Sequence, residues 1–294
     1  MAESECDIPR RPVELEFDAS EVPRDWYDAD LHITTFLDAF SILLPEGERF
    51  FVKSVRDTMG AVTDPALRER IAGFIGQEAV HARGHEVFNR FRGDEGTRAM
   101  QAIERDLKKL LIGARRTLPP TGRLAVTCAL EHFTALFAES LLGPNAEFRD
   151  KMHPAVRALW LWHALEESEH KTVAYDVYEA NDGGYAMRVS IMLLTTAIFF
   201  AALTYGRARI LRARGGLFDV RGWLRVSRHL WLEPGFFRHI VPGYLSYFRP
   251  GFHPNDRDTS ELVASWRERL FGEVGSMREH LARRAPSIAD AVPA

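Results

Sequence analysis

The sequence of 294 residues has only two cysteines, Cys6 and Cys128, too few for a disulfide framework or a cysteine-ligated metal site. We therefore expect the protein to work in a reducing compartment. Basic charge is not in excess either, because 38 lysines and arginines face 41 aspartates and glutamates, for a formal net charge of −3. The sequence has no basic stripe interleaved with aromatic residues, so we expect no binding to nucleic acid. The first residues, MAESECDIPRRPVELEFD, contain no apolar signal region, and we expect a cytoplasmic location.

Long uncharged runs are scarce, and the one that stands out is residues 189–206, between Arg188 and Arg207. Its length is at the threshold for a membrane span. Three interpretations remain, namely a buried helix that covers the bundle, the wall of an apolar pocket, and a contact with the membrane surface. The buried helix is the expected one. A basic stretch follows the run, so contact of residues 189–214 with the inner face of a membrane is the main alternative.

The chain also lacks convincing alternation of polar and apolar residues, so we expect no sheet and an all-α fold. Residues 1–29 are rich in proline and charge, which predicts an extended arm. Residues 30–183 predict a helical bundle, and residues 184–294 predict a helical extension rich in apolar and aromatic side chains. The expected helices span residues 30–44, 48–59, 65–91, 101–115, 120–142, 153–179 and 258–284. Pro45 separates the first two, and Asp64 caps the third.

Carboxylates and imidazoles lie on the inner, otherwise apolar stripes of four of these helices. The pairs Glu78–His81 and Glu167–His170 each have a three-residue spacing, which places both side chains on one face. A buried carboxylate or imidazole needs a partner, and a metal ion satisfies several at once. In chain order the predicted metal ligands are Glu48, Glu78, His81, Glu131, Glu167 and His170. Ferritin-like bundles hold two metals with this set, so we predict a ferritin-like four-helix bundle with a di-metal site.

The predicted ligands are four carboxylates and two imidazoles without a thiolate, a donor set that suits iron, manganese or a mixed pair. We expect two metal ions, with iron as the first expectation. The neighbours of Glu131 on its face are small, which leaves room for dioxygen or another ligand beside the metals.

Two further histidines, His85 and His163, lie four residues from a predicted ligand and share its face. We take them as candidate catalytic residues, in acid–base roles. Additional metal ligation or hydrogen bonding to a ligand also fits their positions. The alternative for each is a core histidine that is satisfied by a carboxylate.

Other polar residues near the site have weaker assignments. Glu166 and Glu169 lie on the flanks of their helix, where we expect exposed or supporting residues. His132 follows Glu131 directly and therefore points about 100° away from it. Tyr175 and Tyr178 are potential redox neighbours, but we expect them to belong to the core.

The segments that carry these residues are LLPEGERFF (residues 43–51), GQEAVHARGH (76–85), EHFTA (131–135) and WHALEESEHKTVAYDVY (162–178). In combination they resemble the bacterial family of predicted metal-dependent hydrolases, over about residues 30–181. The family's name implies hydrolysis. Its motif pattern resembles the ferritin-like superfamily, in which redox and oxygen chemistry predominate, so the name alone does not decide the reaction.

We first expect an oxygen-activating oxidoreductase, with two irons and an electron donor, that acts on an apolar or lipid-like substrate. The alternative is a metal-dependent hydrolase, in which a metal-bound hydroxide attacks the substrate and His85 or His163 serves as base. Iron storage or oxidation without an organic substrate is the third candidate. The long aromatic-rich extension makes storage the least expected of the three, and we expect a homodimer.

Overall fold

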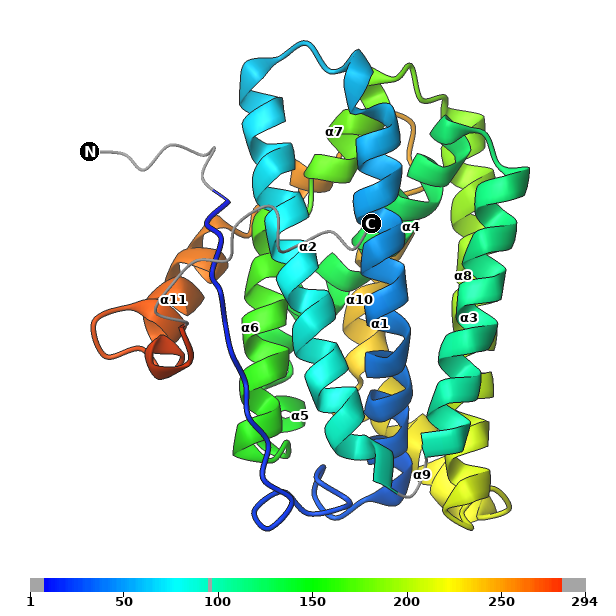
Figure 1. Cartoon of the computed structure of the whole chain (residues 1–294), viewed down its shortest axis with the longest axis vertical. Coiled ribbons are helices and arrows are strands. Elements are labelled where there is room, and N and C mark those ends of the chain that lie inside the picture. The colour runs from blue at the N-terminus through cyan, green and yellow to red at the C-terminus, as the bar shows by residue number, and fades with distance from the viewer. Residues whose placement is uncertain (1–7, 95–96, 282–294) are drawn as a thin grey trace.

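The computed structural model describes residues 8–94 and 97–281, and within these ranges it contains helices and no strand. The all-α fold expected from the sequence is confirmed, whereas Cys6 lies outside the described residues. Long helices run along the longest axis of the molecule (Figure 1). They and the shorter helices are α1 (Leu31–Thr58), α2 (Pro65–Phe91), α3 (Thr97–Thr117), α4 (Pro120–Leu142), α5 (Ala146–Asp150), α6 (Pro154–His170), α7 (Val173–Ala180), α8 (Tyr185–Ala213), α9 (Val220–Trp231), α10 (Phe236–Ser246) and α11 (Ser260–Phe271).

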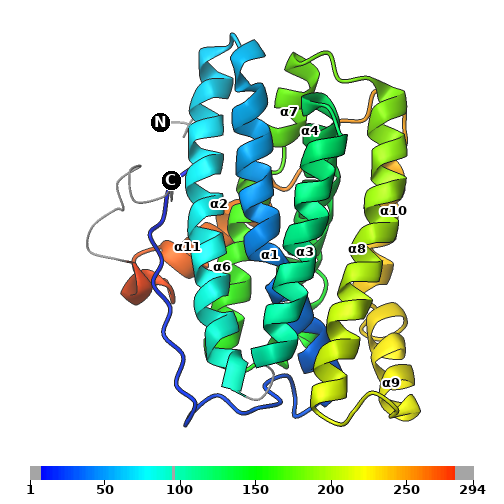
Figure 2. The same cartoon turned by 45° about the vertical axis from the view of Figure 1, so that its right-hand side comes forward.

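Four helices, α1, α2, α4 and α6, form the central bundle. Helix α1 packs against α2 and α4, and α6 packs against both α4 and α2. Helices α3 and α8 lie side by side on one flank of this bundle, where both contact α1 (Figures 1 and 2). The fold thus encloses one space between the four central helices and leaves α8 on the outside.

The first helix differs from its prediction, because α1 continues through Pro45 and the expected break there is wrong. Proline has no N–H, so the carbonyl four residues earlier loses its usual helical partner. That carbonyl belongs to Ser41, and the side chain of Asn89 on α2 donates to it at 3.1 Å. The substitute hydrogen bond allows one continuous helix.

The expected bounds of α2 and α4 are confirmed closely. Asp64 precedes α2, and its side chain accepts a hydrogen bond from the Ala66 N–H at 3.0 Å, as an N-cap does. The single helix expected over residues 153–179 is wrong, because the chain turns after His170 and separates α6 from α7. Lys171 at this turn donates to the carbonyl of Arg257 at 2.6 Å, which ties the turn to the C-terminal extension. The last helix ends at Phe271, earlier than expected.

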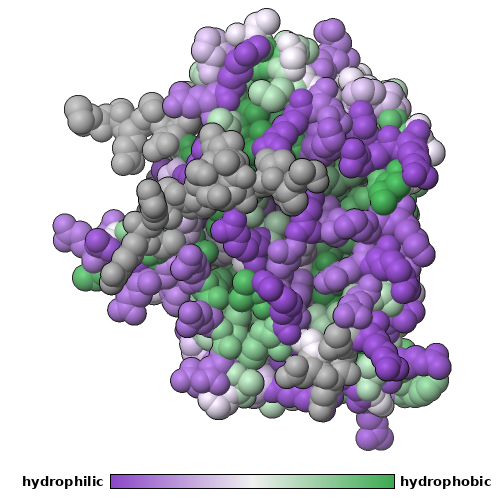
Figure 3. Space-filling view, viewed as in Figure 1, coloured by the Kyte–Doolittle hydropathy of each residue, from purple (hydrophilic) through white to green (hydrophobic). Residues whose placement is uncertain are grey.

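The apolar run at residues 189–206 forms most of α8, and its expected burial is wrong. By length and composition, α4 and α8 are both able to cross a membrane. The apolar window of α4 is 89% buried, whereas that of α8 is only 28% buried. Leu193 and Leu194 are 55% and 51% exposed. Much of the rest of the surface is polar, as the face in Figure 3 shows, with hydrophobic patches between hydrophilic side chains.

The N-terminal arm crosses the outside of α2 and α6 as a chain without helix (Figure 1). Ile8 packs directly on α2 at Gly73, where a Cβ would lie 2.6 Å from the Ile8 Cβ. Trp26 and Tyr27 are buried at the other end of the arm. The arm is therefore part of the packed structure, and it brings polar groups to the outer side of α2.

Candidate metal centre

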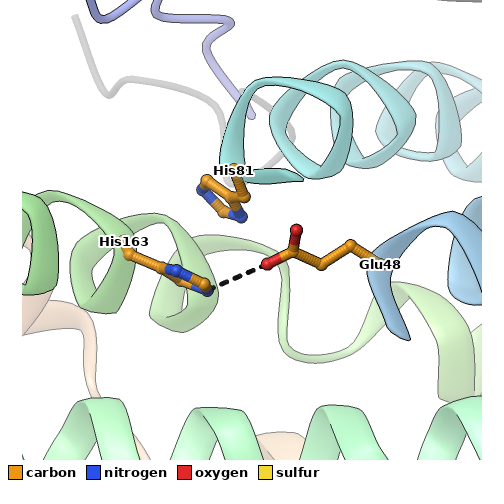
Figure 4. A group of neighbouring side chains, drawn as sticks. All are labelled: Glu48, His81 and His163. Carbon is orange, nitrogen blue, oxygen red and sulfur yellow. Dashed lines mark ion pairs between the residues drawn. The ribbon is translucent and has the colours of Figure 1, made fainter. Parts of the chain in front are cut away.

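The six predicted ligands converge in the space between the four central helices, and each is at most 2% exposed. Together with His163 they form two groups, in each of which the potential ligand atoms lie within 4.8 Å of one another. The first group is Glu48, His81 and His163, from α1, α2 and α6 (Figure 4). The second group is Glu78, Glu131, Glu167 and His170, from α2, α4 and α6. Two adjacent clusters of this kind are what a pair of metal ions requires.

Whether these residues are suited to bind a metal can be judged from their buried polar atoms that have no hydrogen-bond partner. Buried polar atoms are almost always hydrogen-bonded in proteins, because an unpaired one is costly. Here all six predicted ligands carry a buried atom without a hydrogen-bond partner. These atoms are both carboxylate oxygens of Glu48, Glu78 and Glu131, Oε2 of Glu167, Nδ1 of His81 and Nε2 of His170. A divalent cation accepts electron pairs from oxygen and nitrogen together, so the donor set fits bound metals.

Two of the histidines are oriented by hydrogen bonds on their outer sides. The Nε2–H of His81 donates to Glu166 at 2.9 Å, which leaves Nδ1 for the centre. The Nδ1–H of His170 donates to the side-chain oxygen of Gln77 at 2.9 Å, which leaves Nε2 for the centre. Metal-bound histidines in proteins are held in this way, with the second ring nitrogen hydrogen-bonded to a carboxylate or a carbonyl.

Glu166 and Glu169 extend this support outward. Both side chains are fully buried, and Arg11 of the N-terminal arm bonds to them at 2.9 and 2.7 Å. Gln77 also donates to Glu169 at 2.9 Å, so the partners of His81 and His170 form one network. Burial raises the pKa of Glu166 to about 8, although Arg11 opposes the rise. Of the two positions expected for these glutamates, exposed or supporting, the exposed one is wrong, because the structure buries both side chains beside the partners of the predicted ligands.

His163 is oriented by a separate chain of hydrogen bonds that begins in α1. The hydroxyl of Ser41 donates to Asn89 at 2.7 Å, so its oxygen accepts the Nδ1–H of His85 at 2.8 Å. Burial lowers the pKa of His85 well below its usual range, and its neutral ring therefore offers Nε2 as an acceptor. The Nδ1–H of His163 donates to that atom at 2.7 Å.

This chain leaves the Nε2 lone pair of His163 directed at the centre. The atom lies 2.8 Å from Oε1 of Glu167. It lies 3.8 Å from Oε1 of Glu48, the contact that is dashed in Figure 4. The contact with Glu167 has hydrogen-bond geometry, and Nε2 also lies within reach of the potential ligand atoms of Glu48 and His81, where a metal ion would take the place of a proton. The geometry thus groups His163 with the metal ligands, while His85 is one step removed and holds it in place.

The pKa values of the residues in the two clusters also show that buried carboxylates lie close together without enough positive charge beside them. Burial and the neighbouring carboxylates raise the pKa values of Glu48 and Glu131 well above their usual range. Burial lowers the pKa of His81. Burial likewise works against ionisation of Glu167, but His170 and His163 bring its pKa well below the usual value. Metal binding replaces protons on such groups, so affinity for the metals should rise with pH.

A third acidic cluster, Asp176, Glu179 and His253, provides a contrast. It is partly exposed, and two of its three members, Asp176 and His253, already have partners. His253 donates to Asp176 at 2.9 Å, and Asp176 pairs with Arg70 at 2.7 Å. With these polar atoms satisfied, we assign no metal to this cluster.

Several supporting residues were missed from the sequence. Gln77 and Ser41 carried a weak signal, because Gln77 precedes Glu78 and Ser41 lies two helical turns before Glu48. Arg11 carried none, since its partners are more than 150 positions away. The three residues that were not expected to bind metal, His132, Tyr175 and Tyr178, have hydrogen-bond partners outside the two clusters. His132 bonds to the carbonyl of Gly243, and Tyr175 and Tyr178 donate to the carbonyls of Phe252 and Gly184.

Comparisons with known proteins agree with a metal-dependent site. The model of the family described as predicted metal-dependent hydrolases matches residues 9–258 of this chain. No protein of curated function and no solved structure matches it. The matched segment includes both clusters, the supporting residues from Arg11 to Asn89, and most of the C-terminal extension. The chain therefore belongs to the family of predicted metal-dependent hydrolases.

Proposed function

We propose that the protein is a hydrolase that depends on two metal ions. Glu48, His81 and His163 would hold one ion. The second ion would be held by Glu78, Glu131, Glu167 and His170. The unpartnered buried atoms of the six predicted ligands are the observation that carries the proposal. The arrangement of one glutamate or one Glu-x-x-His pair on each of four helices is the one ferritin-like bundles use.

Metals in such a site polarise a carbonyl or phosphoryl oxygen and make bound water a nucleophile near neutral pH. Among the site residues, His163 and Glu167 also line an apolar pocket beside the clusters. These two side chains therefore meet the reacting end of a substrate. The attacking water would lie beside these two ligands, and one of its protons would pass to the leaving group. One water is consumed, its oxygen forms the new bond to the acyl carbon, and its proton ends on the leaving alcohol.

The family assignment favours hydrolysis over the oxygen-activating oxidoreductase that was expected first. Oxygen activation remains a second candidate because of one observation, the donor set of carboxylates and imidazoles without thiolate, which suits iron. The two candidates differ in their need for dioxygen. Hydrolysis of an ester proceeds equally well under nitrogen, whereas an oxygenase stops.

The test uses the full chain loaded separately with iron, manganese or zinc, and a p-nitrophenyl ester as substrate. Glu78→Gln keeps the shape of the side chain but removes a charged ligand. Glu69→Gln, an exposed position on the same helix, is the matched control. We expect hydrolysis under nitrogen by the wild type and the control, and its loss in Glu78→Gln. Equal hydrolysis by both variants, or turnover only with dioxygen, would overturn the proposal.

A further inference from the structure

A large apolar groove runs along the flank of the bundle between α3 and α8. It has a volume of about 420 Å³, and its walls come from α1, α3, α4 and α8. On α3 the lining extends from Leu107 to Thr117, which corresponds to about 15 Å of helix. On α8 it includes Leu194 and Ile198, which are 51% and 38% exposed. Exposed apolar surface of this extent marks a binding site more often than a free surface.

The groove lies next to the pocket that reaches the metal centre. This inner pocket is lined by His163 and Glu167 at one end and has a volume of only about 40 Å³. Phe40, Leu44 and Thr134 line both hollows and form the wall between them. The wall consists of side chains, so changes of rotamer are sufficient to connect the two spaces.

The sizes of the two hollows define how a substrate fits. On the same measure the inner pocket, about 40 Å³, is roughly a tenth of the groove, about 420 Å³. It therefore suits a small reacting group better than a chain. The groove has the volume and the apolar walls that a hydrocarbon chain requires.

Charge at the edge of the groove points to the same kind of molecule. Between Leu107 and Thr117, α3 contains four cations and no acidic residue. The cations are Lys108, Lys109, Arg115 and Arg116, and Lys109 itself lines the groove. An apolar surface flanked by cations suits amphiphiles and anionic lipid surfaces.

We infer that the groove between α3 and α8 binds the acyl chain of a long-chain ester, with the carbonyl end directed past Phe40, Leu44 and Thr134 toward Glu167 and His163. The direction of the chain rests on the proposed hydrolase. Occupancy of the groove by a chain does not, because it depends only on the groove's shape and walls. The exposed side of α8 is where the chain enters.

The test measures binding of cis-parinaric acid, a fluorescent long-chain fatty acid, to the full chain. Leu194→Asp places a charge on the groove wall, and Leu193→Asp, equally exposed but outside the lining, is its control. Gly113→Trp fills the groove, since a Cβ at Gly113 meets no atom within 4 Å. Gly60→Trp, equally unobstructed but away from the groove, is its control.

We expect both groove variants to weaken binding at least about ten-fold, because loss of contact with a few methylenes is sufficient for that change. Both controls should bind as the wild type does. Metal content should be unchanged in all four variants, so a failure of the groove and a failure of the metal centre are distinguishable. Equal binding by groove variants and controls, or no binding by the wild type, overturns the inference.

The source of the chain is tested with the same probe in two forms. In one arm the probe is dispersed in buffer, and in the other it is embedded in phosphatidylglycerol vesicles. Transfer from the vesicles assigns the substrate to a membrane. Binding of the dispersed probe alone assigns a soluble ester, and binding in neither arm contradicts a chain-binding groove.

Discussion

Two regions of the molecule have the reverse of the usual polarity. The space between the four central helices is charged, and the outer side of α8 is apolar. Four glutamates and their histidine neighbours lie in the interior, at most 4% exposed. On the surface, α8 presents leucines that are half exposed and has no charged residue between Arg188 and Arg207. Both features need an explanation. Charged side chains are seldom fully buried without partners, and a soluble protein seldom exposes a large contiguous apolar patch.

Each of the two regions lacks contacts that its side chains require, and the missing contacts differ in kind. The interior lacks partners for carboxylate oxygens and imidazole nitrogens, and the proposed metal cations would supply them. The flank at α3 and α8 lacks apolar contact, and the proposed hydrocarbon chain would supply it. The two regions meet at Phe40, Leu44 and Thr134, where the proposed chain would approach the proposed metals.

The largest effect should come from removing the metals. Without cations the clustered carboxylates repel one another and remain unsatisfied, so the free energy of unfolding should fall by about 4 kcal/mol when the metal is normally present at a thousand-fold excess over its Kd. Urea denaturation with and without a chelator measures the change. Identical midpoints in both conditions would mean that the interior is complete without metal.

A comparison of two leucines on α8 tests the outer region. Leu203 is 4% exposed and Leu193 is 55% exposed on the same helix. We expect Leu203→Ala to reduce the free energy of unfolding by about 2–5 kcal/mol, because it leaves a cavity. Leu193→Ala should change it by less than about 0.5 kcal/mol, because that side chain is largely in water. A large loss for Leu193→Ala would show that the outer face of α8 is covered in solution.

The support of the ligands should have a smaller effect than the metals themselves. Gln77→Leu removes the acceptor of the His170 Nδ1–H, so metal affinity should fall about 10- to 100-fold. Competition with a chelator of known affinity measures it. Gln101→Leu on the surface of α3 is the control and should leave the affinity unchanged. Equal metal affinity in both variants would show that Gln77 does not support the metal centre.

The parts of the site that could be predicted are those with local signals. Helical periodicity placed Glu78 with His81 and Glu167 with His170 on inward stripes, and the structure brings them together. The continuous α1 could not be predicted, because the bond that replaces the missing N–H of Pro45 comes from Asn89 on another helix.

The exposure of α8 was also beyond the sequence. An uncharged run has the same pattern whether its partner is the core of its own chain or a molecule outside it. Arg11 was missed for a related reason, since its contacts with Glu166 and Glu169 join the N-terminal arm to a helix more than 150 positions away in the sequence.

The smallest effect concerns the cluster that has no need of metal. The hydrogen bond to Asp176 raises the pKa of His253, so its protonated form stabilises the folded state. This stabilisation is fully present below the usual histidine value of 6.5 and is lost as the pH rises through the raised value. His253→Ala should remove at most about 1 kcal/mol below that range. The loss should be the same with and without chelator. A loss that depends on metal would show that this cluster also binds a metal ion.

The central claim is that the buried carboxylates and histidines hold two metal ions, and metal content measures it directly. The protein is purified after expression in medium supplied with iron, manganese and zinc, and metals are counted per chain by plasma mass spectrometry. We expect two ions per chain in the wild type and their loss in Glu131→Ala and His170→Ala, with the folded state checked by circular dichroism. A folded wild type without stoichiometric metal, or unchanged metal content in both variants, would contradict the account.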